Sequence, residues 1–333
     1  MVTSQNLGSR AAEPRKRARS AEALRQLRRA LGERRDGGLQ AAYGDARWRT
    51  LWLRLVFALL ELALPITQVV AFAAEVNQRI RQQGLAKAST ESANRLGLEC
   101  EFVFSEAAQR ALTTLPVIVY GNHPTIMTPF LLAAAAGRDD MRFFIVDYAL
   151  RLIPSLGEYV LPLRTPPVRI LVEWRRGGIK RVISRRLARL FMEHEDRATA
   201  RQANCHSLAE GVRHLEQGGC IVIFPGGGGH HVGKWYPGIA RLVENVRGHP
   251  EAPDVLLLPM HEDGGSEAQI YEGLRQLNRG TSPKHRTRFS ARVRFAKPRR
   301  LQDFVPPETG CDQIIRKLEA DYAATFPRLR TVP

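Results

Sequence analysis

The chain has 333 residues, 44% of them hydrophobic and 25% charged, which is ordinary for a globular protein with one large domain plus an appendage, or with two domains. Its 50 Lys and Arg residues against 33 Asp and Glu residues give a formal net charge of +17, which favours anionic partners such as phospholipid surfaces, nucleic acid or phosphorylated substrates. The four scattered cysteines form no Cys-x-x-Cys pair, which argues against a zinc ribbon and a disulfide framework.

Residues 1–45 are predicted to be a basic tail. The first 19 are rich in arginine and predicted to be disordered. No cleavable signal peptide is expected, because the first fifty residues are polar and lack an apolar core segment. Leucines recur at helical spacing among arginines in 24-LRQLRRAL-31, which indicates a basic amphipathic helix. Such a helix can lie on an anionic membrane or remain a solvated charged helix. Nucleic-acid binding is less favoured, because this stretch has no aromatic residues to stack on bases.

Residues 46–94 are predicted to be an apolar, helical, membrane-associating segment. The run 51-LWLRLVFALLELALPITQVVAFAA-74 has about the length of a bilayer span. However, Arg54 and Glu61 share one helix face and are costly inside a bilayer, and Pro65 can kink the helix. Three arrangements stay open: a kinked hairpin half immersed in the membrane, a single span, and a helix packed on the soluble domain.

Residues 95–333 are predicted to form an α/β domain, because short apolar runs alternate there with helical patterns. Continuously apolar strands between helices indicate a mixed, largely parallel sheet flanked by helices. The predicted strands are 100–104, 116–120, 142–147, 159–163, 219–225, 255–260 and 291–296. The predicted helices are 127–137, 178–196, 205–217, 237–247 and 310–324. In such sheets, active sites lie at the carboxyl ends of strands.

Four motifs follow one another in this domain: 121-GNHPTIMTPF-130, 154-PSLGEYVLPLR-164, 207-SLAEGVRHLEQGGCIVIFPGGGG-229 and 255-VLLLPMHEDG-264. Their order resembles the glycerolipid acyltransferase family, which includes the lysophosphatidic acid acyltransferases, over roughly residues 95–325. In that family the first motif is Asn-His with an Asp five residues after the His. The resemblance implies that the His is the general base on an acceptor hydroxyl, and that the hydroxyl then attacks the thioester of acyl-CoA or acyl-carrier protein.

The first motif is matched in part. Asn122 and His123 are at the family's Asn and His positions, but Thr128 replaces the Asp that orients the His. A hydrogen bond to the second imidazole nitrogen sets the tautomer of a histidine base, and an orienting carboxylate can be worth several orders of magnitude in rate. Thr128 can accept such a bond but supplies no charge. Asp147, at the end of strand 142–147, is the nearest alternative acid.

The other motifs imply the substrate-binding residues. Phe224, Pro225 and Gly227 match the family's Phe-Pro-Glu-Gly, with Gly226 in place of the Glu and no Arg afterwards. Backbone N–H groups of such a glycine run can form a nest for an anion. Arg164 matches the basic residue that ends the second motif. Lys234 is interpreted as a phosphate or coenzyme contact.

Two other motifs offer alternative sites. Residues 228–234 spell Gly-x-x-x-x-Gly-Lys, close to a P-loop, but Trp235 stands where Ser or Thr would bind Mg²⁺. His230, His231, His261, Glu262 and Asp263 could hold a metal ion or simply line the rim of a cleft. We predict no metal site.

The sequence thus predicts a phospholipid/glycerol acyltransferase-like protein that moves a fatty acyl group from acyl-CoA or acyl-carrier protein to a lipid acceptor hydroxyl. It is expected at the cytoplasmic face of a membrane, peripherally or through one short membrane segment, with an anionic phospholipid surface as partner. No cofactor beyond the acyl thioester co-substrate is expected. The alternative is a catalytically inactive scaffold of the same fold that binds lipid or acyl chains. A nucleic-acid binder, with steep salt dependence on DNA, is the third interpretation.

Overall fold

A computed structural model describes residues 66–147, 149–164, 197–227, 235–249, 254–278 and 287–327. The chain divides into two compact units. The larger unit consists of Gln78–Asp147, Ser155–Pro166 and His194–Pro333, and the smaller of Met1–Asn77, Tyr148–Pro154 and Pro167–Glu193. The predicted basic tail, the first part of the apolar segment, the helix 178–196 and the run from Gly228 to Lys234 lie outside the described residues.

The second part of the predicted apolar segment is helical. Helix α4 (Ile66–Leu96) is broken at Gly84, whose φ of 78° and ψ of 169° are not helical. Its residues up to Asn77 belong to the smaller unit, as does the short helix α7 (Ala149–Leu152). Within the described ranges, no helix is both long and apolar enough to cross a membrane.

The larger unit is built on a mixed sheet, as predicted. Its strands are β1 (Leu98–Val103), β2 (Val117–Gly121), β3 (Met141–Val146), β4 (Val160–Leu163), β5 (Cys220–Ile223), β6 (Leu256–Asp263), β7 (Phe289–Phe295) and β8 (Arg299–Arg300). Their order is β1-β7-β6-β2-β5-β3-β4, and β8 pairs with β6. Strands β6, β2, β5, β3 and β4 run parallel, whereas β7 is antiparallel to β6. All predicted strands are confirmed, β8 was not predicted, and β6 runs past its predicted end.

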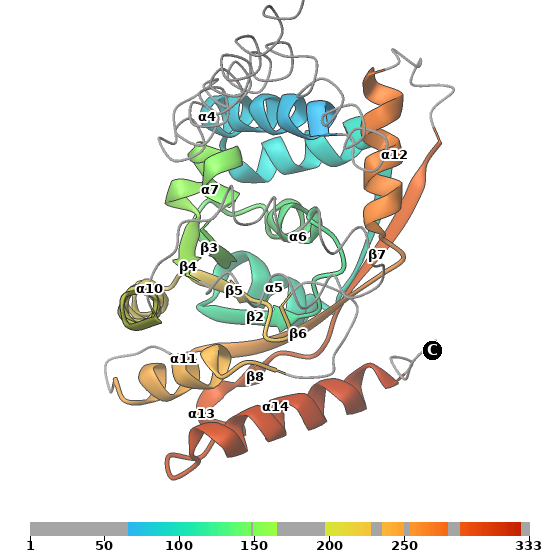
Figure 1. Cartoon of the computed structure of the whole chain (residues 1–333). Coiled ribbons are helices and arrows are strands. Elements are labelled where there is room, and N and C mark those ends of the chain that lie inside the picture. The colour runs from blue at the N-terminus through green and yellow to red at the C-terminus, as the bar shows by residue number, and fades with distance from the viewer. Residues whose placement is uncertain are drawn as a thin grey trace, which may run out of the picture. The chain divides into compact units, whose positions relative to one another are not determined.

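Helices cover both faces of this sheet. They are α5 (Glu106–Thr114), α6 (Thr128–Ala136), the 3-10 helix η1 (Pro154–Glu158), α10 (Arg197–Glu216), α11 (Gly238–Arg247), α12 (Glu267–Asn278), α13 (Leu301–Phe304) and α14 (Cys311–Thr325). Helices α11 and α14 lie on one side of the sheet and α6 on the other (Figure 1). The predicted helices 127–137, 237–247 and 310–324 are confirmed. Helix α10 begins eight residues before its predicted start, and α5 and α12 were not predicted.

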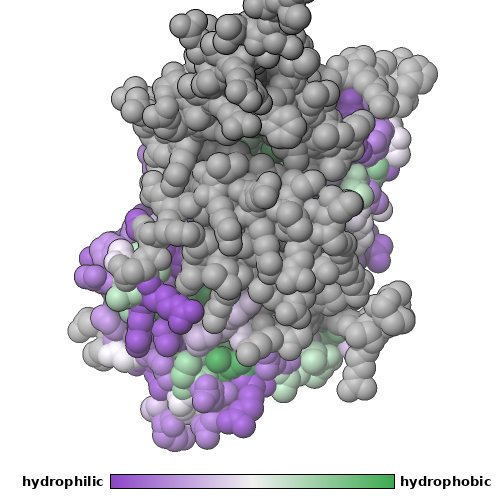
Figure 2. All heavy atoms as spheres, in the orientation of Figure 1, coloured by the Kyte–Doolittle hydropathy of each residue, from purple (hydrophilic) through white to green (hydrophobic). Residues whose placement is uncertain are grey.

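Burial explains why the central strands are apolar throughout. Every residue of β2 and of β5 is buried, as expected for parallel strands covered on both faces. Helix α10 is amphipathic instead. Its Leu208, Val212 and Leu215 join the core together with residues of α11 and α14, whereas Arg201, His206 and Arg213 are exposed. Hydrophilic atoms accordingly gather at the lower left of Figure 2, where α10 lies in Figure 1.

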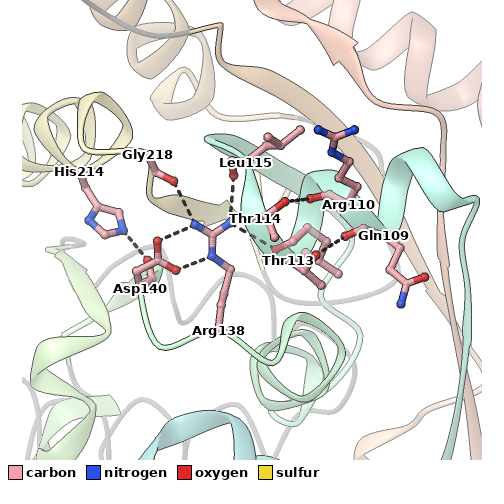
Figure 3. Close-up of polar contacts among 10 residues, drawn as sticks. Gln109, Arg110, Thr113, Thr114, Leu115, Arg138, Asp140, His214 and Gly218 are labelled. Atoms are coloured by element: carbon pink, nitrogen blue, oxygen red, sulfur yellow. Dashed lines mark hydrogen bonds and ion pairs between the residues drawn. The ribbon is translucent and has the colours of Figure 1, made fainter.

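Arg138 ties together the turns at the amino ends of three strands. Its guanidinium donates to the carbonyl oxygens of Leu115, just before β2, at 2.9 Å and of Gly218, just before β5, at 3.0 Å. It also pairs with Asp140, just before β3. The ring of His214 donates from Nε2 to the carbonyl of Asp140 (Figure 3). This cluster therefore stabilises the sheet at the edge opposite to the carboxyl ends of the strands.

Replacing Arg138 with methionine is expected to lower the free energy of unfolding by about 2–3 kcal/mol, because several carbonyl groups lose their donor at once. Urea denaturation of the full chain measures this loss. Arg142→Met is the matched control, since Arg142 and its partner Glu210 are both about one-third exposed, at 31% and 38%, and surface pairs contribute at most about 1 kcal/mol. Equal losses in the two variants would contradict the assigned role of Arg138.

Candidate functional site

His123 lies just beyond the carboxyl end of β2. Its ring stacks on that of Phe224, which follows the adjacent parallel strand β5, with ring centroids 4.6 Å apart and planes 24° apart. The residue is partly exposed, but its Nδ1 atom is buried and has no hydrogen-bond partner among the described residues.

Strand β6 changes partner beside this histidine. Up to Met260 it pairs with β2, and from Met260 onward it pairs with β7. Asn122 continues the contact by means of its side chain: Nδ2 donates to the carbonyl of Glu262, and Oδ1 accepts from the N–H of Glu262, both at 2.8 Å. Asn122 thus anchors the turn that carries His123 to β6.

Two glycines allow the backbone to pack closely against residues of β6 at this point. A Cβ atom on Gly121 would lie 2.0 Å from the carbonyl oxygen of Met260. A Cβ atom on Gly265 would lie 2.6 Å from Oε1 of Glu262. The first glycine lets β2 and β6 touch directly before His123, and the second leaves room for a carboxylate.

Thr128 does not orient His123 in this structure. Its hydroxyl donates to the carbonyl of Thr125 at 2.9 Å and accepts from the N–H of Thr125 at 3.3 Å. Both bonds close the turn between His123 and helix α6, which begins at Thr128. The hydrogen bond from the imidazole to Thr128, considered from sequence, is therefore absent.

A buried glutamate, Glu262, and a partly buried one, Glu267, flank the same turn, and sequence reasoning assigned neither of them a part in orienting His123. Glu262 is 1% exposed, and within the described structure neither oxygen of its carboxylate has a hydrogen-bond partner. Glu267, in the first turn of α12, accepts a hydrogen bond at Oε1 from the N–H of Ile126 at 2.9 Å. The only hint in the sequence was the acidic pair after the apolar run of β6.

Burial shifts the pKa values of the histidine and of both glutamates away from their charged forms. It lowers the pKa of His123 to about 4, offset in part by the backbone of Thr125. It raises the pKa of Glu262 to about 7, where the nearby Thr128 hydroxyl opposes the shift and Glu267 and Asp263 add to it. Burial also raises the pKa of Glu267. At neutral pH the imidazole is therefore uncharged, and Glu262 is close to its titration midpoint.

The opposite face of β6 carries a separate network. His261 is bonded through Nδ1 to the hydroxyl of Tyr322 at 2.8 Å and through Nε2 to Asp263 at 2.9 Å. The Tyr322 oxygen also accepts from the N–H of Asn122 at 3.2 Å, so α14 helps to position the turn. His261 and Glu262 point to opposite faces because side chains alternate along a strand. In the described part of the chain, no three His, Cys, Asp or Glu residues are grouped to hold a metal ion.

The remaining predicted residues are spread along the same edge of the sheet. Pro225 and Gly226 follow Phe224, and Gly227 turns the chain with a φ of 74°. Arg164 follows β4, where its main chain pairs with the side chain of Asn204 at 2.7 and 2.9 Å. Strand β4 is three positions from β2, about 14 Å at the usual strand spacing. Asp147 follows β3, two positions from β2. Lys234 is outside the described residues.

Comparison with solved structures shows a distant structural likeness. The chain is similar to the 1-acyl-sn-glycerophosphate (LPA) acyltransferase PlsC of Thermotoga maritima, with a TM-score of 0.39 and 13% sequence identity. The match covers 80% of this chain and 97% of that one. No family model and no curated protein matches the sequence.

Proposed function

We propose that the protein transfers a fatty acyl group from a thioester, acyl-CoA or acyl-carrier protein, to the hydroxyl of a lipid acceptor, with His123 as general base. One observation carries the proposal: the ring of His123 stacks on Phe224 at the carboxyl edge of adjacent parallel strands. The first and third motifs of the acyltransferase resemblance thus meet, through two residues about a hundred positions apart in the chain, where α/β enzymes hold their active sites.

The chemistry follows from the neutral imidazole. His123 takes the proton of the acceptor hydroxyl as the oxygen attacks the carbonyl carbon of the thioester. The tetrahedral intermediate collapses with cleavage of the carbon–sulfur bond, and the protonated imidazole returns the proton to the leaving thiolate. The backbone N–H of Gly226 is suited to stabilise the negative oxygen of the intermediate, whereas that of Gly227 donates to the carbonyl of Phe224 at 3.0 Å.

The charge of the chain suits anionic substrates and surfaces. Arg164 and Lys234 are proposed to hold phosphate groups of the donor or the acceptor. The net charge of +17 and the apolar residues of 46–94 are proposed to keep the protein at the cytoplasmic face of an anionic phospholipid membrane. The reaction written above needs no cofactor besides the thioester.

Release of free thiol by the purified full chain tests this proposal. Long-chain acyl-CoA and acyl-carrier protein serve as donors, with lyso-phospholipid, glycerol and amine acceptors. Acceptor-dependent release is expected to fall by about 10³-fold or more in His123→Ala, since general base catalysis contributes about 10²–10⁴-fold. Arg142→Met, remote from the site in the sheet, is the control.

Two outcomes would contradict the proposed function. Release that is equally fast in wild type and His123→Ala would assign the activity to another site. No release from any donor, together with binding to anionic vesicles, would instead identify the protein as a lipid-binding scaffold with an acyltransferase-like turn.

A further inference from the structure

Two buried polar groups without hydrogen-bond partners lie at the turn from Asn122 to Thr128. One is Nδ1 of His123, and the other is the carboxylate of Glu262. A buried polar group without a hydrogen bond costs about 1–3 kcal/mol, and such groups are uncommon in folded proteins. One belongs to the proposed catalytic base and the other to a residue that contacts the same turn, which indicates a function rather than a contribution to stability.

The contacts of Glu262 place its carboxylate at this turn. Its peptide group is held by the side chain of Asn122, the residue before His123. Its carboxylate lies near the hydroxyl of Thr128, five residues after His123. Gly265 has no Cβ to fill the space beside Oε1, and that space is shared with Thr125. Glu262 therefore contacts residues on both sides of His123, Asn122 through its peptide group and Thr128 through its carboxylate.

We propose that Glu262 is the positioning residue for His123: its carboxylate accepts the Nδ1–H of the imidazole during reaction and leaves Nε2 to take the acceptor's proton. Strand β6 thus supplies the charge that the resemblance assigns to position 128. The inference rests on the proposed function. The bond is not yet formed in this structure, in line with the long or poorly aligned catalytic hydrogen bonds of unliganded sites.

The threonine at position 128 is compatible with a carboxylate that comes from Glu262 instead. An aspartate at position 128 would bring a second carboxylate next to Glu262, and two like charges in one buried site repel. The threonine hydroxyl instead forms its hydrogen bonds with the backbone of Thr125. It therefore holds the turn without competing for Nδ1 of His123.

The groups around Glu262 set its protonation state, and so the pH range in which its carboxylate can accept the hydrogen bond from His123. Glu267 on α12 and Asp263 on β6 are like charges that favour its protonated form, together with burial. On β1, which is separated from β6 by β7, the Cys100 thiol has its pKa raised by burial and by Glu262, and it stays uncharged. Ionised Glu262 stabilises the imidazolium and so makes His123 a stronger base. Activity is therefore expected to rise with pH through about 7, with apparent pKa values that belong to the pair.

The kinetic test compares Glu262→Gln with Glu267→Gln. In the first variant kcat is expected to fall about 10²-fold at pH 8 with little change in KM, and the rise near pH 7 to disappear. Glu262→Asp should restore part of the rate. Glu267→Gln removes a like charge while its amide oxygen can still accept the N–H of Ile126, so the rise should move to lower pH. Glu262→Gln should add little to His123→Ala, because residues that act as one unit are not additive.

A second measurement does not depend on turnover. In the ¹⁵N spectrum of full chain labelled at histidine, with His123→Ala for assignment, His123 is expected as the Nδ1–H tautomer at pH 8. Its shifts should change with a midpoint near pH 7 in wild type and lack this step in Glu262→Gln. The same tautomer and the same titration in both proteins would overturn the inference.

Different results would contradict the role of Glu262 and the proposed acyl transfer. Acyl transfer that depends on His123 but is unchanged by Glu262→Gln at every pH would overturn the role of Glu262 and leave the proposed function standing. Coupled titration of His123 and Glu262 without transfer from any donor would refute the proposed function while the pairing of the two residues stands.

Discussion

Replacing Gly121 with alanine is expected to lower the free energy of unfolding by about 3 kcal/mol or more. The added Cβ would meet the carbonyl oxygen of Met260 at 2.0 Å and its sulfur at 2.3 Å. The sulfur belongs to a side chain that can move, but the carbonyl belongs to β6 and is fixed by pairing on both sides. The overlap is therefore relieved only if β2 and β6 separate where the hydrogen bonds of Asn122 begin.

Urea denaturation of the full chain measures the loss, and Gly157→Ala is its control. Gly157 is exposed in η1, and an added Cβ would meet nothing within 4 Å, so that variant is expected to stay within about 0.5 kcal/mol of wild type. If Gly121→Ala unfolds fully, thermal denaturation with a lipid or acyl-CoA present reports whether any folded protein remains. Stability equal to that of the control would show that β6 yields at Met260.

Glu262 is expected to make stability fall as pH rises. Its pKa is 4.5 in an unfolded chain and about 7 in the folded protein. Between these values the folded state keeps a proton that the unfolded state has lost, so the free energy of unfolding falls with pH across that window and is constant above it. The full effect is about 3 kcal/mol, taking 1.36 kcal/mol for each pKa unit.

His123 acts in the opposite direction and masks part of this fall. Burial lowers its pKa from 6.5 to about 4, so stability rises with pH through that range and is fully present above pH 6.5. Between about pH 4.5 and 6.5 the two slopes nearly cancel in the wild type. Above pH 6.5 the remaining slope belongs to Glu262.

Unfolding free energies of wild type and Glu262→Gln, measured from pH 4.5 to pH 8, separate the two groups. The difference between the proteins is expected to change by about 3 kcal/mol over this range, with the variant gaining relative to wild type as pH rises. His123→Ala should expose the full downward slope of Glu262. A difference that does not change with pH would mean that Glu262 is ionised in the folded state.

The core of the fold could be predicted from the local sequence, because buried strands and helix faces are recognisable by their apolar residues. Strands covered on both faces must be apolar along their whole length, so β2 and β5 appear as unbroken apolar runs, and the glycines after α10 mark its end. Helix α11 is visible for a similar reason, with Ile239, Leu242 and Val246 buried at helical spacing. By contrast, α5 and α12 are short and rich in polar residues, so their periodicity was too weak to recognise.

The candidate site also contains residues that the sequence could identify and residues that it could not. Asn122 and His123 could be identified from the motif alone, and the stacking of His123 on Phe224 agrees with the order of the motifs. The end of β6 could not be identified, because His261, Glu262 and Asp263 break the apolar run and resemble a loop. They continue the strand because β7, about thirty residues later, supplies the pairing partners Arg294, Val293 and Arg292.

The α/β architecture and the position of the candidate base could be predicted from the amino-acid sequence, since both are encoded in neighbouring residues. The acid that we propose to accompany that base became apparent only in the folded chain. Position 128, where the resemblance expects a carboxylate, holds a threonine that is occupied within its own turn, and Glu262 reaches the turn from another strand. Contacts between strands depend on pairing between distant segments, and the spacing of residues along the chain carries no record of them.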